Sequence, residues 1–383
     1  MKIAGVMTGT SCDGLDIACM EFGADGWRPL WARSASYPGA LRKRVLAAQV
    51  PGATLSLKAW GEMHRDLGAW MGRTIARILK EFPSARPDAI ASHGQTVAHF
   101  PSARKAGFTI QLGDPARIAE VTGLTVISNF RDGDMAAGGE GAPLAPRFHQ
   151  ALAGGKTGIA IHNLGGISNL TYLGPKGLTL AFDTGPANLW IDAAAALVSA
   201  GRMHFDRDGR LAARGKPDLQ AVERILKTPF FHRKPPKSTG RDDFPFHLLL
   251  ESASSRNEDL VATATAITVE SVVQAYDRFI RRKGLPLTAI YFCGGGSRNR
   301  HLMECLRGEL NGIRVGSLDE LGFDSKFLEA QAFAYFGYLA LQGKPLGGSW
   351  TGAEPGAPSA HIIPGRNWLQ VVRRLERANS RSL

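Results

Sequence analysis

The chain has 383 residues, of which 44% are hydrophobic and 21% charged, proportions typical of a globular enzyme with a sizeable buried core. It contains no apolar run near the roughly 18 residues that span a bilayer, so a membrane protein is not expected. The apolar run at its start is interrupted at Thr8 and Asp13, so a secretory signal is not expected either. The net charge of +12 could suggest a nucleic-acid-binding protein. However, much of the excess charge lies at connectors and chain ends, and the sequence has neither a zinc-finger spacing nor a long basic helix. A solvated basic surface is therefore favoured.

The chain begins with a strand–turn–strand pattern. An apolar run at Ile3–Met7 breaks into a polar turn, Thr8–Gly14, and resumes over Leu15–Phe22. Two glycines in the turn allow positive φ and a close approach to a ligand, and Asp13 supplies a carboxylate that could hold a metal bound to phosphate. The pattern predicts a phosphate-binding hairpin that lacks the lysine and the following helix of a P-loop.

Helices and strands alternate after this hairpin. Helical periodicity with end signals predicts helices at Lys58–Phe82, between Asp114-Pro115 and Gly123, and at Ala187–Ala200, Glu258–Lys283 and Phe327–Leu341. Apolar runs bounded by turn residues predict strands at Ile3–Met7, Asp16–Phe22, Leu30–Tyr37, Ala89–Ser92, Thr125–Ser128, Gly158–Asn163, Ser168–Leu173, Leu178–Phe182 and Ala289–Cys293. This alternation predicts an α/β protein with mixed sheets.

The first hairpin has a weak repeat half a chain later. Gly158–Leu173 again reads as strand, glycine-rich turn and strand, with Asn163–Asn169 in the place of Thr8–Gly14. Two such hairpins indicate two related domains that face one another and hold phosphates between their turns. A third glycine cluster, Gly294–Gly296, could lie against a nucleobase or ribose; a plain strand-to-helix turn is the alternative, and the two hairpins favour the nucleotide.

Polar clusters follow several of the predicted strands. They are Ser92–Thr96, Asn129–Asp134, Gly138–Leu144 and Phe182–Asn188. Because α/β proteins place ligands at strand ends, the clusters together favour a polar ligand such as a sugar, although each alone could be ordinary capping or a structural ion pair. Asp183 is the best catalytic candidate, since it ends an apolar strand at a Gly-Pro turn, and the helix that follows favours its ionised form.

The order of these motifs carries a specific resemblance. The segments are Gly9–Asp16, Ser92–Thr96, Phe130-Arg131 with Asp134, Gly138–Leu144, Asn163–Asn169, Phe182–Pro186 and Pro235–Arg241. In sequence and over nearly the whole chain they resemble the anhydro-N-acetylmuramic acid kinase family. The departures are Thr8 where a serine is expected, Glu140 where a glutamine is frequent and Ala187 where a glycine is frequent.

The resemblance implies a fold and its domains. The family belongs to the superfamily of sugar kinases, actin and heat-shock-chaperone ATPases, which implies two related domains with mixed β-sheets flanked by helices (actin-like ATPase, ribonuclease H-like) and with ATP and sugar in the interdomain cleft. We expect residues 1–135 to form the first domain, with the C-terminal segment 345–383 packed back on it. Residues 136–344 would form the second domain.

The resemblance also implies an activity. The family opens the internal 1,6-anhydro bond of 1,6-anhydro-N-acetylmuramic acid and phosphorylates O6 with ATP, giving N-acetylmuramic acid 6-phosphate and ADP, in peptidoglycan recycling and amino-sugar catabolism. ATP and Mg²⁺ are the cofactors that this implies. Cytoplasmic location and a homodimer are expected, with neither nucleic acid nor membrane as partner; the four cysteines, which show no paired spacing, agree with a reducing compartment.

The site residues implied by the resemblance fall into four groups. Asp183 is the catalytic base, and Asp13 is the candidate Mg²⁺ ligand. ATP and phosphate would be bound by Gly9, Thr10, Ser11, Cys12, Asp13, Gly14, Leu15, Asp16, Gly165, Gly166, Ser168, Asn169, Gly294, Gly295, Gly296 and Asn299. The sugar would be bound by His93, Gln95, Thr96, Arg131, Asp134, Glu140, Asp183 and Thr184.

Three other functions stay open at this point. A kinase for another sugar would keep the fold and use Asp183 to deprotonate a hydroxyl directly. A nucleotide-binding regulator or chaperone-like ATPase would bind ATP without any sugar-dependent turnover. A nucleic-acid-binding protein would rest on charge alone and would show steep salt dependence. The basic segment Pro235–Arg241 is either a mobile flap or an ordinary surface loop.

Overall fold

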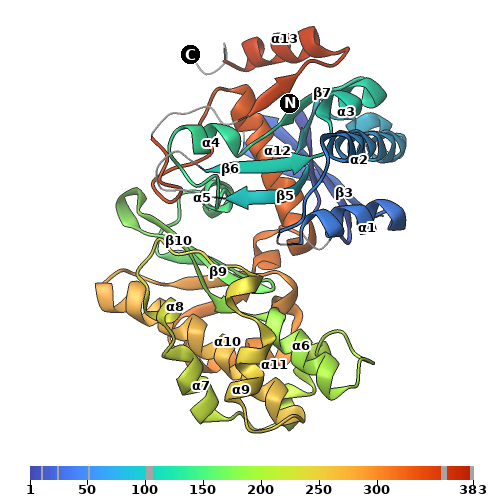
Figure 1. Ribbon diagram of the computed structural model, residues 1–383. Helices are drawn as coiled ribbons and strands as arrows, with labels where there is room; N and C mark the ends of the chain where they lie inside the picture. Colours follow the sequence, from blue (N-terminus) through green and yellow to red (C-terminus); the bar gives the residue numbers. More distant parts are fainter. Residues whose placement is uncertain (10–11, 24–25, 51, 101–106, 355–359, 380–383) are drawn as a thin grey trace. The chain divides into compact units, whose positions relative to one another are not determined.

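The structure is a computed structural model that describes residues 1–9, 12–23, 26–50, 52–100, 107–354 and 360–379. The chain divides into two compact units, Met1–Phe148 with Lys326–Leu383 and His149–Ser325 (Figure 1). The sequence suggested boundaries at 135 and 344 instead. The second boundary differs because helix α12 (Leu328–Leu341) packs on the strands of the first unit.

The first unit is built on a six-stranded mixed sheet with the strand order β13-β7-β4-β1-β2-β3. Its strands are β1 (Lys2–Met7), β2 (Gly14–Gly23), β3 (Gly26–Ser36), β4 (Ala89–Ser92), β7 (Thr125–Ser128) and β13 (His361–Ile363). β1 pairs antiparallel with β2 and parallel with β4, so the hairpin turn after β1 lies beside the carboxyl end of β4. A separate two-stranded sheet contains β5 (Gln95–Phe100) and β6 (Phe108–Leu112).

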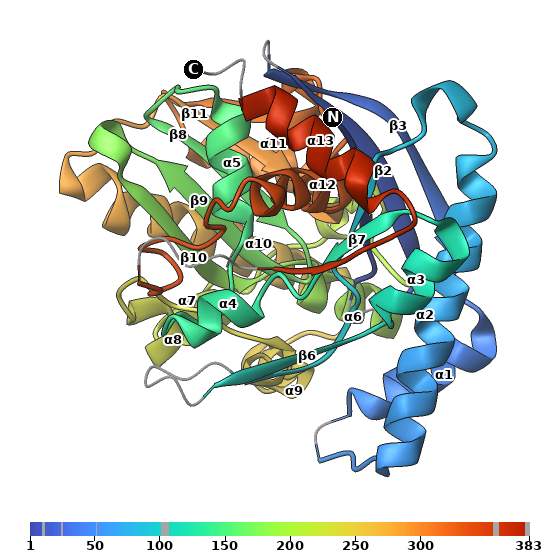
Figure 2. The ribbon, with the colours of Figure 1, turned by 90° about the horizontal axis from the view of Figure 1, so that it is seen from above.

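Two helical layers cover the two faces of this sheet. The helices of the unit are α1 (Gly39–Ala48), α2 (Leu57–Leu79), α3 (Pro115–Thr122), α4 (Asp132–Ala136), α5 (Ala145–Ala153, which runs into the second unit), α12 and α13 (Trp368–Asn379). Because side chains alternate along a strand, Ala4 and Val6 of β1 join the core cluster that includes α2, whereas Ile3 and Gly5 face α12. Seen from above, α2 and α12 lie on opposite sides of the strands (Figure 2).

The second unit is built on a five-stranded mixed sheet with the order β10-β9-β8-β11-β12. Its strands are β8 (Ile159–Leu164), β9 (Ile167–Leu173), β10 (Thr179–Pro186), β11 (Ala289–Cys293) and β12 (Arg314–Ser317). Its helices are α6 (Asn188–Val198), α7 (Leu219–Leu226), α8 (Pro229–His232), α9 (Phe246–Ser252), α10 (Glu258–Phe279) and α11 (Arg300–Glu309). The central helix α10 is buried along most of its length and contacts α6, α7, α11 and β10.

The two units repeat one strand arrangement. In each, a three-stranded antiparallel meander (β1-β2-β3 or β8-β9-β10) continues through its first strand into two parallel strands (β4-β7 or β11-β12). The predicted fold class, α/β with two related units of mixed sheets flanked by helices, is therefore confirmed. The hairpin repeat that was visible in the sequence is the central hairpin of each sheet.

Local chemistry explains the helix ends that the sequence predicted. Asp114 caps α3 by accepting the backbone N–H of Ala116 at 2.9 Å, and Gly123 ends the helix with a φ of 71°. The predicted helix from Glu258 to Lys283 ends earlier, at Phe279. A short 3₁₀ turn, Arg281–Lys283, completes the segment.

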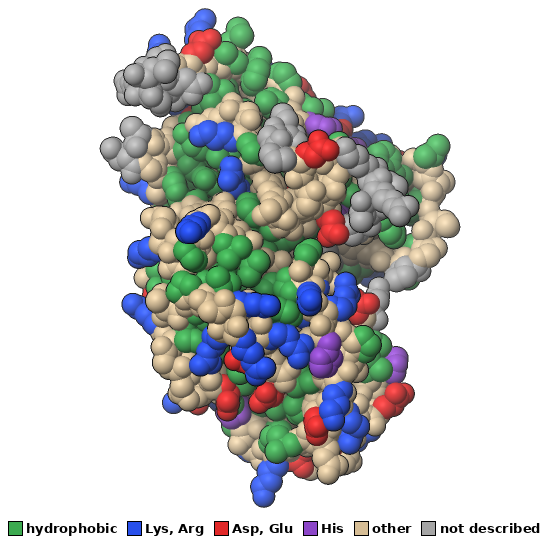
Figure 3. Space-filling view, turned by 90° about the vertical axis from the view of Figure 1, so that its left-hand side faces the viewer, with side chains coloured by type: hydrophobic (Ala, Val, Ile, Leu, Met, Phe, Trp, Pro, Cys, Tyr) green, Lys and Arg blue, Asp and Glu red, His purple; other side chains and the backbone are tan. Residues whose placement is uncertain are grey.

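Basic side chains are distributed over much of the face shown in Figure 3, with acidic side chains among them. Several form exposed ion pairs, such as Arg28 with Glu21 and Arg44 with Asp66. Such pairs contribute little to stability, about 0–1 kcal/mol each. None of the helices in the described ranges combines the length and the apolarity needed to cross a bilayer.

The contact between β1 and α12 depends on glycine. A Cβ atom at Gly5 would lie 1.8 Å from the carbonyl oxygen of Ala330 and 2.3 Å from the nitrogen of Ala334, both backbone atoms. Gly5→Ala should therefore force the helix from the sheet and lower the free energy of unfolding by about 1–3 kcal/mol, as overpacking typically does. Chemical denaturation of the purified variant measures this loss.

Gly23→Ala is the matched control, because a Cβ at Gly23 of β2 would meet nothing within 4 Å. We expect its free energy of unfolding to stay within about 0.5 kcal/mol of the wild type. Equal destabilisation by both substitutions would show that the strands do not tolerate alanine for reasons other than the helix contact.

Candidate active site

The turn between β1 and β2 is supported from one side by Gln95. This fully buried side chain accepts a hydrogen bond from Thr8 Oγ1 at 2.9 Å and donates one to the carbonyl oxygen of Gly9 at 3.1 Å. Thr10 and Ser11, two predicted phosphate ligands, lie outside the described residues. Gln95, predicted as a sugar ligand, therefore uses both ends of its amide to hold the turn.

Helix α1 and the residue that follows it, Gln49, also support this turn. Arg42 donates from Nε to the carbonyl oxygen of Cys12 at 3.0 Å, and its Nη2 lies 3.4 Å from Asp13 Oδ1. Gln49 Oε1 accepts a weak hydrogen bond from the Cys12 thiol at 3.9 Å, and Gln49 Nε2 donates to the carbonyl oxygen of Thr96 at 2.8 Å. Arg42 was not predicted as a site residue, because nothing in the local sequence pattern distinguishes it from the other basic residues of α1.

The predicted residues of this turn differ in accessibility. The side chain of Asp13 is 74% exposed, whereas Leu15 is fully buried in the core and Asp16 accepts a hydrogen bond from Ser34 Oγ at 2.5 Å. Within the described ranges there is no group of three or more His, Cys, Asp or Glu that could hold a metal ion. Mg²⁺ fits Asp13 nevertheless, because this ion is commonly held by one or two carboxylates together with phosphates and water.

An arginine and a histidine meet beyond the ends of β4 and β7. Arg131 donates from Nε to Nε2 of the buried His93 at 3.1 Å and from Nη1 to the carbonyl oxygen of Gly141 at 2.8 Å. Burial, and then the charge of Arg131, lower the pKa of His93 well below its usual range, so His93 is neutral and accepts this hydrogen bond. The Arg131 guanidinium is thereby held in one orientation.

Asp134 organises the glycine-rich loop that follows. Its Oδ2 accepts the backbone N–H of Gly141 at 2.7 Å, and its Oδ1 accepts a hydrogen bond from Thr351 Oγ1 at 2.8 Å. The exposed Glu140 lies on this loop, and its backbone N–H is bonded to the carbonyl oxygen of Thr351. With 1% of its surface exposed, Asp134 holds the loop, and Glu140 presents its carboxylate to solvent.

In the second unit, strand register brings three polar residues into one row. Asn169 of β9 lies opposite Asn163 of β8 on one side and opposite Asp183 of β10 on the other. All three are partly exposed. Since directly opposed residues project from the same face of a sheet, this row is the polar surface at the end of the second sheet.

The neighbouring hydroxyl groups point into the core instead. Ser168 Oγ accepts a hydrogen bond from Thr184 Oγ1 at 2.7 Å and lies 2.7 Å from His162 Nε2, while His162 Nδ1 lies 2.9 Å from the hydroxyl of Tyr276. Burial lowers the pKa of His162 to about 3, which keeps it neutral. Ser168 and Thr184, predicted as phosphate and sugar ligands, thus support the sheet from inside, because alternation places Ser168 opposite in direction to Asn169.

The third glycine cluster packs against the second hairpin. A Cβ at Gly294 would lie 2.3 Å from Asn163 Oδ1, and one at Gly296 would lie 2.7 Å from the Cβ of Leu164, so close backbone packing requires both glycines. Asn299 caps α11 by accepting the backbone N–H of Leu302 at 3.1 Å. In contrast, a Cβ at Gly166 would meet nothing within 4 Å, although the Gly166 carbonyl oxygen accepts the backbone N–H groups of Ala187 and Leu189.

Asp183 lies within β10 beside the segment 235–241, because the strand predicted to end before it continues through a β-bulge at Asp183/Gly185 to Pro186. Its Oδ2 accepts the backbone N–H of Thr239 at 2.8 Å, and its own N–H donates to the carbonyl oxygen of Lys237 at 3.0 Å. Burial raises the pKa of the Asp183 carboxyl to about 6, although the hydrogen bond from Thr239 and the charge of Lys237 both lower it. The carboxylate is therefore ionised at neutral pH and basic enough to accept a proton.

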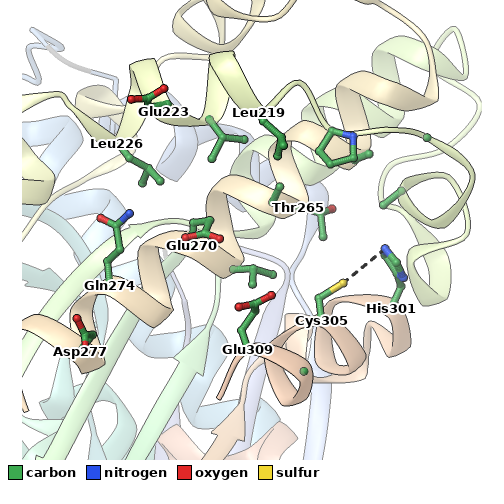
Figure 4. Close-up of a pocket in the computed structure, with 18 of the residues that line it drawn as sticks. Leu219, Glu223, Leu226, Thr265, Glu270, Gln274, Asp277, His301, Cys305 and Glu309 are labelled. Atoms are coloured by element: carbon green, nitrogen blue, oxygen red, sulfur yellow. Dashed lines mark hydrogen bonds between the residues drawn. The ribbon is translucent and has the colours of Figure 1, made fainter. Parts of the chain in front are cut away.

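The second unit also has a hollow away from these residues. A groove of about 960 Å³ runs along α10 between α7 and α11 (Figure 4). Apolar side chains such as Leu219 and Leu226 line it together with Glu270 and Glu309, and Cys305 Sγ lies 3.7 Å from His301 Nε2. The residues that line this groove include none of the predicted site residues.

Comparison with known proteins assigns the chain to a family. The family model described as anhydro-N-acetylmuramic acid kinase matches residues 1–363. The chain belongs to the anhydro-N-acetylmuramic acid kinase family. Its relatives include the kinase of that name from Rhodococcus erythropolis, 38% identical over 389 residues (97% of this chain, 96% of the relative), and the one from Acidithiobacillus ferrooxidans, 40% identical over 384 residues (97% and 94%).

The predicted site residues of this family member divide by position into those a ligand can reach and those that support them. The accessible ones are the turn backbone at Gly9 and Gly166, the side chains of Asp13, Arg131, Glu140, Asn169 and Asp183, and the half-buried Thr96. The supporting ones are Leu15, Gln95, Asp134, Ser168, Thr184, Gly294, Gly296 and Asn299. Neither Arg42 nor Lys237 was assigned a role from the sequence, although Lys237 lies within Pro235–Arg241, one of the segments that carry the family resemblance.

Arg42 provides a direct test of the first turn. Arg42→Ala removes the donor to the Cys12 carbonyl and the positive charge beside Asp13, so we expect kcat of the ATP-dependent reaction to fall by about 10²–10³-fold. Arg44→Ala, two residues along the same helix, is the control because Arg44 pairs with Asp66 instead. Steady-state ADP release measures both, and equal losses would contradict a specific role for Arg42.

Proposed function

We propose that the protein is an ATP-dependent kinase that hydrolyses the 1,6-anhydro bond of 1,6-anhydro-N-acetylmuramic acid and phosphorylates O6. The products are N-acetylmuramic acid 6-phosphate and ADP. Membership of the anhydro-N-acetylmuramic acid kinase family supports this proposal. The relatives named above have that name and align with this chain over nearly their whole length. The activity would serve peptidoglycan recycling and amino-sugar catabolism.

The observation that carries the mechanism is the environment of Asp183. Thr239 holds Oδ2, and among the described residues no hydrogen bond to Oδ1 is formed, which leaves that oxygen for a water molecule. The pKa of about 6 means that the group is ionised at pH 7 and is a stronger base than an ordinary aspartate. These are the properties of a general base that activates water.

The chemistry needs only this one carboxylate. Opening an acetal normally requires an acid to protonate the leaving oxygen and a base to activate water. Here the oxygen of water bonds to C1 while the C1–O6 bond breaks, and O6 bonds to the γ-phosphorus while ADP leaves. Asp183 takes the proton from water, and the phosphoryl group replaces the proton that O6 would otherwise need.

The remaining roles follow from accessibility. Backbone N–H groups of the turns at the half-buried Gly9 and Gly166 would contact phosphates, and the oriented Arg131 would bind the lactyl carboxylate of the sugar. Asp13 would hold Mg²⁺, which when bound neutralises charge on the phosphates. Arg42 fixes the Cys12 carbonyl and adds a positive charge beside Asp13.

The first experiment measures ATP turnover in ¹⁸O-labelled water, with and without 1,6-anhydro-N-acetylmuramic acid. We expect sugar-dependent ADP release and one ¹⁸O at C1 of a 6-phosphorylated product. Asp183→Asn keeps the size of the side chain but cannot accept the proton, so turnover should fall by about 10²–10⁴-fold. Asp192→Asn, a change at a second aspartate of the same unit whose pKa is also raised to about 6, is the control and should keep its activity.

Other outcomes select other functions. Product from an ordinary hexose without ¹⁸O at C1 would indicate a kinase that deprotonates a hydroxyl directly. ATP turnover that is indifferent to any sugar would indicate a nucleotide-binding regulator or chaperone-like ATPase.

The pKa of Asp183 sets an acid limit. Because the base must be ionised, kcat should fall as pH drops through about 6, by about tenfold for each further unit. Initial rates from pH 4.5 to 7.5, at saturating ATP and sugar, measure this limb. A rate that stays level down to pH 4.5 would contradict the assignment of Asp183 as base.

Three further expectations belong to this proposal. Mg²⁺ dependence is tested by chelation and restoration of turnover. A homodimer is tested by sedimentation of the purified protein. A cytoplasmic location is tested by fractionation, and it agrees with the free thiols of Cys12, Cys19, Cys293 and Cys305.

A further inference from the structure

The segment 235–241 lies along the open edge of the second sheet. β10 is an edge strand, and the backbone of Asp183 pairs with that of Lys237. Two residues later, Thr239 donates its N–H to the Asp183 carboxylate. Thr239 Oγ1 also donates to Asp243 Oδ2 at 2.6 Å, and the backbone N–H of Gly240 donates to the same oxygen at 3.1 Å. The segment is therefore held by hydrogen bonds at Lys237, Thr239 and Gly240.

The side chain of Lys237 is buried beneath this segment. Only 5% of the residue is exposed, and its ammonium lies 4.4 Å from the ring centre of Phe230, 5.6 Å from that of Phe279 and 6.0 Å from that of Phe182. Nζ also donates to the carbonyl oxygen of Phe230 at 3.3 Å. Aromatic faces attract a cation, and the attraction increases when the cation is removed from water.

The surroundings of Lys237 make it an unusual core residue. The charged groups that face it are Asp183 on β10, Arg278 on α10 and Arg233 after α8. The two arginines repel the ammonium, and only the aspartate among these three attracts it. Burial, followed by Arg278 and Arg233, lowers the pKa of Lys237 to about 8. A buried charge in such surroundings is costly, and an apolar side chain of the same length would fill the space without that cost.

We propose that Lys237 is a positioning residue for Asp183, and that its caged ammonium fixes the segment 235–241 so that Thr239 binds Oδ2 and Oδ1 is presented to water. This inference rests on the proposed function, in which Asp183 is the base. Lys237 touches neither the sugar nor the reacting atoms in this assignment. It acts through the backbone that joins it to Asp183 and Thr239 and through its charge.

The role has a signature in the pH profile. The positive charge of Lys237 lowers the pKa of Asp183, so its removal should raise the pH at which activity is lost on the acid side. Lys237 loses its proton near pH 8. Its contacts with the three phenylalanine rings should then weaken, because a neutral amine lacks the charge that the aromatic faces attract. The wild type should therefore lose activity on both sides, near pH 6 and near pH 8.

The test compares Lys237→Met, Lys237→Arg and Lys237→Gln with the control Lys234→Met, a change at an exposed lysine just before the segment. For Lys237→Met we expect kcat to fall by roughly 10–100-fold, as misplacement of a catalytic group does, with KM for ATP little changed. Its acid limb should move to higher pH. Lys237→Arg should keep the acid limb and extend activity above pH 8, because guanidinium stays charged. Lys234→Met should match the wild type.

A folded Lys237→Met protein with wild-type kcat and an unchanged pH profile would overturn the proposal. Should Lys237→Met fail to fold, Lys237→Gln and Lys237→Arg are measured in its place. A Lys237→Arg protein that still loses activity near pH 8 would contradict the proposal. A general structural role would lower kcat without moving either limb.

A second readout separates this inference from the proposed function. Carbon-13 labelling of aspartate allows the pKa of Asp183 to be measured by NMR without any substrate. A higher pKa in Lys237→Met than in the wild type supports the link between the two residues even if the sugar is not turned over. Equal values in the two proteins would overturn the link even if the kinase activity is established.

Discussion

The structure depends on the position of one hairpin in each sheet. β1 and β8 are each antiparallel to the next strand of the chain and parallel to a strand that follows much later, so the hairpin turn lies at the edge where parallel strands end. Turn backbone and strand-end side chains are thereby collected on one edge of each unit. In the first unit this edge holds Asp13, His93 and Arg131, and in the second it holds Asn169 and Asp183.

Buried polar groups hold such an edge in place, and they need hydrogen bonds to offset the cost of their burial. Gln95 meets this requirement beneath the first turn, and Asp134 does so beneath the glycine-rich loop. Ser168 with Thr184 does so behind the second turn. A family motif therefore contains two kinds of residue. Some would contact the ligand, and others hold those residues in position. Replacement of either kind would impair activity, but for different physical reasons.

The chemistry proposed for Asp183 depends on a balance of opposing effects. Burial raises its pKa, and the hydrogen bond from Thr239 and the charge of Lys237 restrain that rise. An isolated exposed aspartate would be too weak a base, and a fully buried one without these partners would be protonated at neutral pH. The segment 235–241 supplies both restraints, which links a basic stretch of sequence to the tuning of a base on a distant strand.

The sequence by itself determined the features that depend on local pattern. Strand periodicity and the repeated glycine turn were enough to predict two related α/β units, Asp114 and Gly123 marked the ends of α3, and the Gly-Pro turn singled out Asp183. Tertiary structure decided what depends on contacts between distant residues. It placed α12 on the first sheet, turned Ser168 inward and Asn169 outward, and brought Arg42 to Cys12 and Lys237 to Asp183. Local propensity says which element a residue joins, but the direction in which its side chain points and the partner it meets are set by strand register and by packing between elements far apart in the chain.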